Sequence, residues 1–180
     1  MNQYPLVFRF RDWIPGSRFV AGVQLVGRVL MSKEEDDGQW WIYGVTPGGL
    51  SESGDDPSDA YAKFRAFFKG ILTDFAEEAA TFEEFEAKVQ RFVGQTDNAD
   101  AKVWDDTRAA VKAGGQVDPA LGGMPKLSGD IPAGLLECVR LTPAPAIPVS
   151  HIAHTVTTTI TATMASDEFG ADFLALAPAA

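Results

Sequence analysis

The residues that could do chemistry are few, and they form no recognisable reactive constellation. The two histidines, His151 and His154, lie in a segment whose alternation of apolar residues and threonines predicts a β-strand. Successive side chains of a strand point to opposite faces, so these two imidazoles would not share a metal ion. The single cysteine, Cys138, lies in an apolar stretch that favours a small buried residue over a nucleophile. The sequence therefore predicts no metal site, no cofactor and no catalytic residue.

Carboxylates are abundant, with 25 Asp and Glu residues. A pair of them could serve a metal-dependent nuclease or a glycosidase. The four consecutive acids Glu34 to Asp37 lack the alternating ligand spacing of a calcium loop and favour a solvated turn. The motifs of serine hydrolases, P-loop proteins and zinc peptidases are absent from the sequence. A carboxylate-dependent hydrolase or nuclease stays an alternative, and a non-enzymatic function is the leading expectation.

The distribution of charge is the main functional clue. The net charge is −10 at neutral pH, which disfavours non-specific binding to nucleic acid or to an anionic membrane because both would repel the chain. Residues 34–62 contain eight acidic residues and no Lys or Arg, whereas residues 1–33 contain five basic residues and one acidic residue. The acidic window is either a solvated surface that aids solubility or a site for a basic protein partner.

Alternation of apolar and polar residues predicts the strands that position these acids. Residues 6–10 form a half-buried strand that turns at 13–16, and residues 19–31 form a longer strand with Gln24 and Arg28 on one face. Residues 40–45, which are aromatic or β-branched, form a third strand. Residues 33–38 join the second and third strands as an acidic hairpin loop, and the Pro and Gly residues at 46–49 form the next turn.

Three helices are predicted after these strands. Asp56 is a suitable N-cap and Pro57 suits the first helical position, so the first helix begins there. Its apolar residues recur every three or four positions and should be buried on the sheet; they are Ala60, Tyr61, Phe64, Phe67, Phe68, Ile71, Leu72 and Phe75. Thr81 and Glu84 form a capping box for a second helix, and Asp97 or Asn98 opens a third over about 99–113.

The C-terminal part is predicted to be rich in strands. Residues 114–134 contain many Gly and Pro residues and indicate a loop, residues 135–141 and 149–164 indicate strands, and Phe169, Phe173 and Leu174 indicate a short helical turn. The predicted fold class is α+β, an antiparallel three-stranded meander packed on helices with a C-terminal strand-rich extension. We expect one α+β domain over residues 1–113, with residues 114–180 as a Gly/Pro-rich connection plus a C-terminal β extension packed on the same domain.

Two aromatic residues of the third strand have two interpretations. Alternation places Trp41 and Tyr43 on the face opposite Trp40 and Ile42. If that face is exposed beside the acidic loop, the pair suits a protein interface; if residues 135–164 fold over it, the pair is core. The predicted partner-binding residues are Asp36, Asp37, Trp41, Tyr43, Glu52, Asp55 and Asp56.

The run from Asp37-Gly38 through the Thr46-Pro47 turn to Asp59-Ala60, with the aromatic-rich helix after it, resembles the central signature of HicB-like antitoxins. The resemblance covers residues 20–78 and implies a partial RNase H-like α+β fold. Family members typically neutralise a small basic ribonuclease toxin, and the acidic window fits such a partner. They commonly bind operator DNA through C-terminal helices, where this chain has a Thr-rich strand, so DNA binding is not predicted.

The leading expectation is a non-enzymatic protein-binding module that neutralises a small basic ribonuclease toxin through an acidic surface. One alternative is a stand-alone oligomeric or regulatory module of the same fold, because a long edge strand favours self-association. The other is the carboxylate-dependent hydrolase or nuclease. A homo-oligomer is expected from the same edge strand. A location in the cytoplasm is expected, because the sequence shows no signal segment and no run of about 18 apolar residues that could span a membrane.

Overall fold

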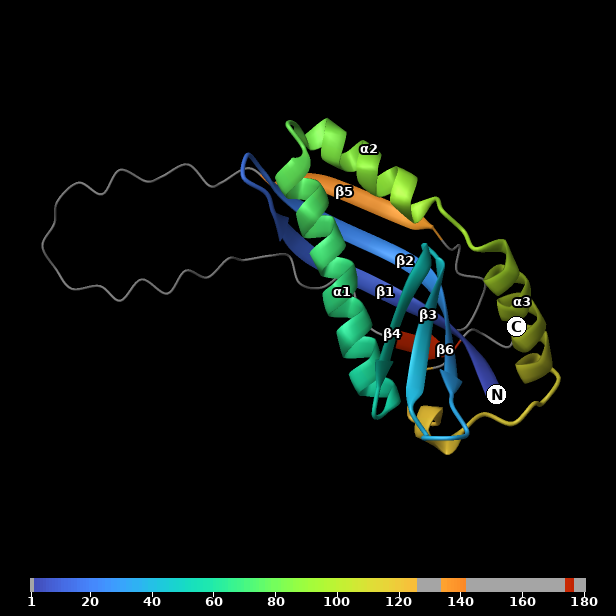
Figure 1. Ribbon diagram of the computed structural model, residues 1–180. Helices are drawn as coiled ribbons and strands as arrows, with labels where there is room; N and C mark the ends of the chain where they lie inside the picture. The colour runs from blue at the N-terminus through green and yellow to red at the C-terminus, as the bar shows by residue number, and fades with distance from the viewer. Residues whose placement is uncertain (1, 126–133, 142–173, 177–180) are drawn as a thin grey trace, which may run out of the picture.

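The computed structural model describes residues 2–125, 134–141 and 174–176, and it shows an antiparallel sheet with helices on both faces (Figure 1). The first four strands are β1 (Asn2–Pro15), β2 (Val20–Lys33), β3 (Trp40–Thr46) and β4 (Gly48–Gly54), and they form a meander in which each strand pairs with the next. The α+β meander predicted from the sequence is therefore confirmed. It has four strands rather than three, because the chain pairs again as β4 directly after the turn at Pro47.

Two further strands complete the sheet. β5 (Leu135–Leu141) pairs with residues 20–26 of β2, and β3 pairs with residues 28–33 along the same edge of β2. β6 (Leu174–Leu176) pairs with residues 6–8 of β1. The two strands that share the edge of β2 separate at Gly27, where a Cβ atom would overlap the ring of Phe8 and the carbonyl oxygen of Thr46.

The three helices begin at the caps expected from the sequence. In α1 (Pro57–Glu78), Asp56 accepts hydrogen bonds from the amides of Ser58 and Asp59. In α2 (Phe82–Val93), Thr81 accepts from the amide of Glu84, and in α3 (Asn98–Lys112), Asp97 accepts from the amides of Ala99 and Asp100. These bonds satisfy amides that have no partner within the helix. A short 3-10 helix, η1 (Pro119–Leu121), follows α3.

The main core lies between the sheet and the helices α1 and α2, on what we call the inner face of the sheet. Phe8 packs edge-on against Phe64 and Phe68 of α1, with ring centroids 5.4 and 5.8 Å apart. Phe19 packs in the same way against Phe82 of α2. Most of the aromatic face predicted for α1 is buried here. Phe67 is an exception: it lies on the side of α1 away from the sheet and is 45% exposed.

α3 packs on the opposite face, which we call the outer face. Trp104 is 5% exposed and lies over Val7, Val26, Leu30 and Val45 in a second, smaller core. Its indole Nε1 donates a hydrogen bond of 3.1 Å to the carbonyl oxygen of Leu6. The first turn of α3 is held near the β3–β4 turn, because the amide of Asp97 donates to the carbonyl oxygen of Val45. The sheet is thus covered on both faces at this end.

The predictions for the C-terminal part are confirmed only in part. Residues 135–141 form a strand as expected. Leu174 is the first residue of β6 rather than part of a helical turn, because it pairs with Phe8 of β1. The predicted strand at 149–164, with His151 and His154, lies outside the described residues, as do Phe169 and Phe173.

Candidate protein-binding site

The acidic residues that follow β2 are held in a tight turn. The amide of Glu34 donates to the carbonyl oxygen of Gln39 at 2.9 Å, and the carboxylate of Asp37 accepts from the amide of Gln39 at the same distance. Gly38 has a φ of 74°, a conformation that glycine adopts without the steric cost of a side chain. The carboxylates of Asp36 and Asp37 are therefore presented to solvent from a backbone of defined shape.

A second set of carboxylates lies where β4 meets α1. Asp56 caps the helix, and Asp59 accepts from the amide of Asp55 at 3.1 Å and from Nζ of Lys63 at 2.8 Å. The hydrogen bond from Lys63, followed by that from the Asp55 amide, lowers the pKa of Asp59. Asp56 and Asp59 thus build the junction, whereas Asp55 is exposed beside them.

Strand register brings these two sets to the same end of the sheet. Lys33 pairs with Trp40, and Trp40 pairs with Gly54. The turn at 34–39 therefore lies next to the junction at 55–59, and we call this region the acidic end. Its acidic residues are Glu34, Glu35, Asp36, Asp37, Asp55, Asp56 and Asp59.

The basic side chains bordering the acidic end already have partners. Lys63 pairs with Asp59, and Nζ of Lys33 lies 3.9 Å from Asp118 and 5.4 Å from the centre of the Trp40 ring. These pairs are partly exposed to solvent, so each contributes little to stability. The remaining carboxylates give this end a negative surface, which would accelerate the approach of a positively charged protein.

Trp41 and Tyr43 lie on the outer face, beside α3. Their rings are stacked, with centroids 6.1 Å apart and planes 14° from parallel. Tyr43 packs against the smaller core under Trp104, and burial, the largest cause, raises the pKa of its hydroxyl. Trp41 is half-buried, and its buried Nε1 atom has no hydrogen-bond partner among the described residues. The pair is therefore half-buried by α3 and not by β5, which pairs with residues 20–26 of β2, and residues 142–164 lie outside the described residues.

Glu52 lies on the other face of the sheet. It pairs with Ile42, whose side chain is buried in the main core. The pKa of Lys63 on α1 is raised chiefly by its hydrogen bond to Asp59, and the charge of Glu52 adds to this effect. The predicted residues therefore lie in three places. Asp36, Asp37, Asp55 and Asp56 lie together at the acidic end, Glu52 lies on the inner side of β4, and Trp41 and Tyr43 lie on the outer face.

The described residues offer few groups for covalent or metal chemistry. They contain no cluster of three or more His, Cys, Asp or Glu side chains that could hold a metal ion. Cys138 packs partly against the main core, and burial, helped by the charges of Glu86 and Glu137, raises its pKa to about 12. Its thiol therefore stays protonated at neutral pH and is a poor nucleophile.

One surface was missed by the sequence analysis. Trp13 was placed in a turn, but β1 continues to Pro15, and Trp13 is 46% exposed on the outer face. The signal was the alternation of Val7, Arg9 and Arg11 opposite Phe8 and Phe10, which extends without interruption to Trp13. Pro15 and Gly16 are typical turn residues, but they end the strand only after Trp13 and Ile14.

No helix in the described part of the chain is both long and apolar enough to cross a membrane. No protein-family model, curated protein or solved structure matches this chain.

Proposed function

We propose that this chain is a non-enzymatic protein-binding module whose acidic end binds a basic protein, in the manner of the HicB-like antitoxins that residues 37–60 resemble. The observation that carries the proposal is the pairing of Lys33 with Trp40 and of Trp40 with Gly54. This register joins two acidic segments that are separated in the sequence into one surface. The basic partner that fits best is a small ribonuclease toxin, whose RNA-binding surface would be masked by the complex.

Two features of the acidic end support this function. Its carboxylates are presented by a tight turn and by a capped helix, so binding would not have to order a long loop. The aromatic pair Trp41 and Tyr43 lies on the outer face of the adjacent strand, and half-buried aromatic side chains are frequent anchors of interfaces. A partner that reaches around β3 would contact both charge and apolar surface.

The experiment is a pull-down from the native host, followed by calorimetry with the purified basic protein that is retained. Asp36→Lys and Asp55→Lys should each weaken the complex about tenfold and reduce its dependence on salt. Glu77→Lys, an exposed acid in the last turns of α1, is the matched control and should bind as the parent chain does. Failure to retain any basic protein, or equal affinity of all three variants, would overturn the proposal.

A further inference from the structure

Three of the four exposed large apolar side chains among the described residues lie on one surface. Trp13, Leu135 and Val139 are 46%, 49% and 49% exposed, and the fourth, Phe67, lies on α1. The three belong to β1 and β5, which flank β2, on the outer face of the sheet. α3 covers this face only around Val7, Val26, Leu30 and Val45. We call the remaining part, formed by residues 9–13, 22–25 and 135–141, the open sheet face.

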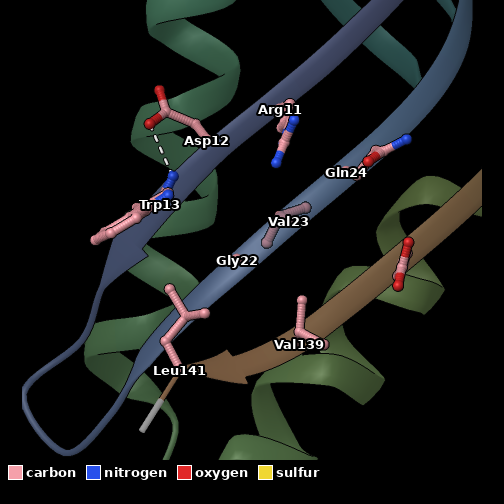
Figure 2. A pocket seen from close by; sticks show the side chains of 9 residues that line it. Arg11, Asp12, Trp13, Gly22, Val23, Gln24, Val139 and Leu141 are labelled. Carbon is pink, nitrogen blue, oxygen red and sulfur yellow. Dashed lines mark hydrogen bonds between the residues drawn. The ribbon is translucent and has the colours of Figure 1, made fainter. Parts of the chain in front are cut away.

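Strand register arranges the open sheet face in rows. Trp13 pairs with Gly22, and Gly22 pairs with Val139, so a residue without a side chain lies between two apolar ones. The result is a hollow of about 120 Å³ between Trp13, Val139 and Leu141 (Figure 2). A Cβ atom on Gly22 would lie 3.3 Å from Val139, which shows how closely β5 borders the hollow.

The next set of paired residues, two positions along the strands, has a positive charge on β1 and a negative charge on β5. Arg11 on β1 pairs with Gln24 on β2, and Gln24 pairs with Glu137 on β5. A two-fold axis parallel to β2 would exchange β1 of one copy with β5 of the other. It would place each Arg11 over the partner's Glu137 and each Trp13 over the partner's Gly22–Val139 hollow.

We propose that the open sheet face is the interface of a homodimer, in which two sheets stack around a two-fold axis along β2. Aligned stacking of this kind is a common way for two sheets to bury apolar faces. The two copies have complementary shapes, because in each copy Trp13 protrudes and the hollow over Gly22 lies beside it at the same level along the strands. The net charge of −10 opposes association at long range, but physiological salt screens charges more than about 8 Å apart.

The size of the surface predicts a reversible dimer. Three strands about 4.8 Å apart, with a rise of about 3.4 Å per residue, give the open sheet face roughly 270 Å² per copy. This lies below the typical 800 Å² or so per partner of a stable complex, so subunit exchange should be fast and association should depend on concentration. The inference does not depend on the acidic end, whose residues lie outside the open sheet face.

The test is sedimentation equilibrium of the full chain at concentrations from about 10 μM to about 1 mM. The parent chain should pass from monomer to dimer in this range. Arg11→Glu and Glu137→Arg should each weaken the dimer about tenfold, because each places like charges opposite one another across the axis, and the double variant should recover the parent affinity within about threefold. Glu77→Arg, on α1, is the charge control and should change nothing.

Chemical cross-linking is the second measurement, and it can detect a dimer that is too weak to be seen by sedimentation. Gln24→Cys places a thiol at the proposed axis, so a short bis-maleimide should link two copies, whereas Ala66→Cys on the exposed side of α1 should not be linked. The native Cys138 should react little because its pKa is about 12. A chain that is monomeric throughout and unlinked at Gln24→Cys would overturn the proposal, as would a double variant no better than the single ones. Another protein, or residues 142–173 of the same chain, would then be the occupant.

Discussion

The ammonium group of Lys69 lies 2.8 Å from the carboxylate of Asp12, and this pair fastens the middle of α1 to the end of β1. Arg65 of the same helix donates to Asp12 at 3.0 Å and to the carbonyl oxygen of Arg11 at 3.4 Å. One turn earlier, the hydroxyl of Tyr61 donates to the carbonyl oxygen of Arg9. α1 therefore packs its apolar face on the sheet while its polar flank hydrogen-bonds the backbone of β1.

Replacement of Asp12 should make stability depend less on pH. Burial, the largest cause, acts to raise the pKa of Asp12, but the hydrogen bonds from Lys69 and the Trp13 amide and the charge of Lys69 outweigh it and lower the pKa. A carboxylate with a lowered pKa stabilises the fold above its ordinary pKa and loses that contribution as the pH falls through the folded-state value. Asp12→Asn should cost about 1 kcal/mol at neutral pH, since Asp12 is partly screened by solvent.

The measurement is urea unfolding at several pH values. The difference in unfolding free energy between the parent chain and Asp12→Asn should be constant near neutral pH and should shrink below about pH 4. Asp106→Asn is the control, because Asp106 pairs with Lys102 in a largely exposed i,i+4 pair. A difference that is the same at acidic and neutral pH would show that the ion pair is not the source of the effect.

Two glycines should respond in opposite directions to alanine. Gly27→Ala should destabilise the protein by about 2 kcal/mol or more, because the added methyl group would overlap Phe8 and the Thr46 backbone. Gly70→Ala should stabilise it by about 0.5–1 kcal/mol, because Gly70 lies inside α1 with nothing within 4 Å of its Cβ position. Thermal unfolding followed by circular dichroism compares the two, and equal shifts would contradict the close packing at Gly27.

The indole of Trp104 should be the main attachment of α3. Trp104→Phe keeps much of the apolar contact but removes the hydrogen bond to Leu6, which should cost about 1 kcal/mol or more, whereas Trp104→Ala should cost about 3–5 kcal/mol. Lys112→Ala, near the end of the same helix, should have little effect. Denaturant unfolding measures these differences, and a Trp104→Ala variant as stable as the parent would show that α3 is held by other contacts.

Capping and partner binding can be separated at neighbouring aspartates. Asp56→Ala should cost about 1 kcal/mol because it leaves the amides of Ser58 and Asp59 without their acceptor, and Asp56→Asn should restore most of the loss. Asp55→Ala should leave stability unchanged, since only its backbone bonds to Asp59. Thermal unfolding checks all three variants, and a loss at Asp55 as large as that at Asp56 would contradict this division.

Local rules predicted the meander and the helices well. Pro57 after Asp56, and Thr81 before Glu84, mark helix starts through hydrogen bonds made within a few residues, so no knowledge of the rest of the fold is required. The inner and outer residues of β2 follow in the same way from strand alternation. Phe67 departs from its pattern because an apolar stripe can be wider than the surface available to cover it.

The candidate site depended on information that a single segment does not contain. Asp36 and Asp55 lie at one end only because β3 pairs with both β2 and β4 in a particular register. Glu52 lies on the opposite face from Trp41 because it pairs with Ile42, the next residue of β3. The helix that half-buries Tyr43 comes from much later in the chain. Leu174 could not be assigned to a strand without its partner Phe8, because three residues show no periodicity of their own.

The pairing of β2 with two different strands along one edge also has a consequence for how the chain folds. β1 to β4 and α1 are consecutive and can associate as soon as they are synthesised, because all their strand pairs are between neighbours. The segment from Val20 to Val26 must wait for β5, and Leu6 to Phe8 must wait for β6. A nascent chain therefore exposes part of one edge of β2 and one edge of β1 until β5 and β6 are synthesised, and this interval is when it is most exposed to aggregation and to chaperones.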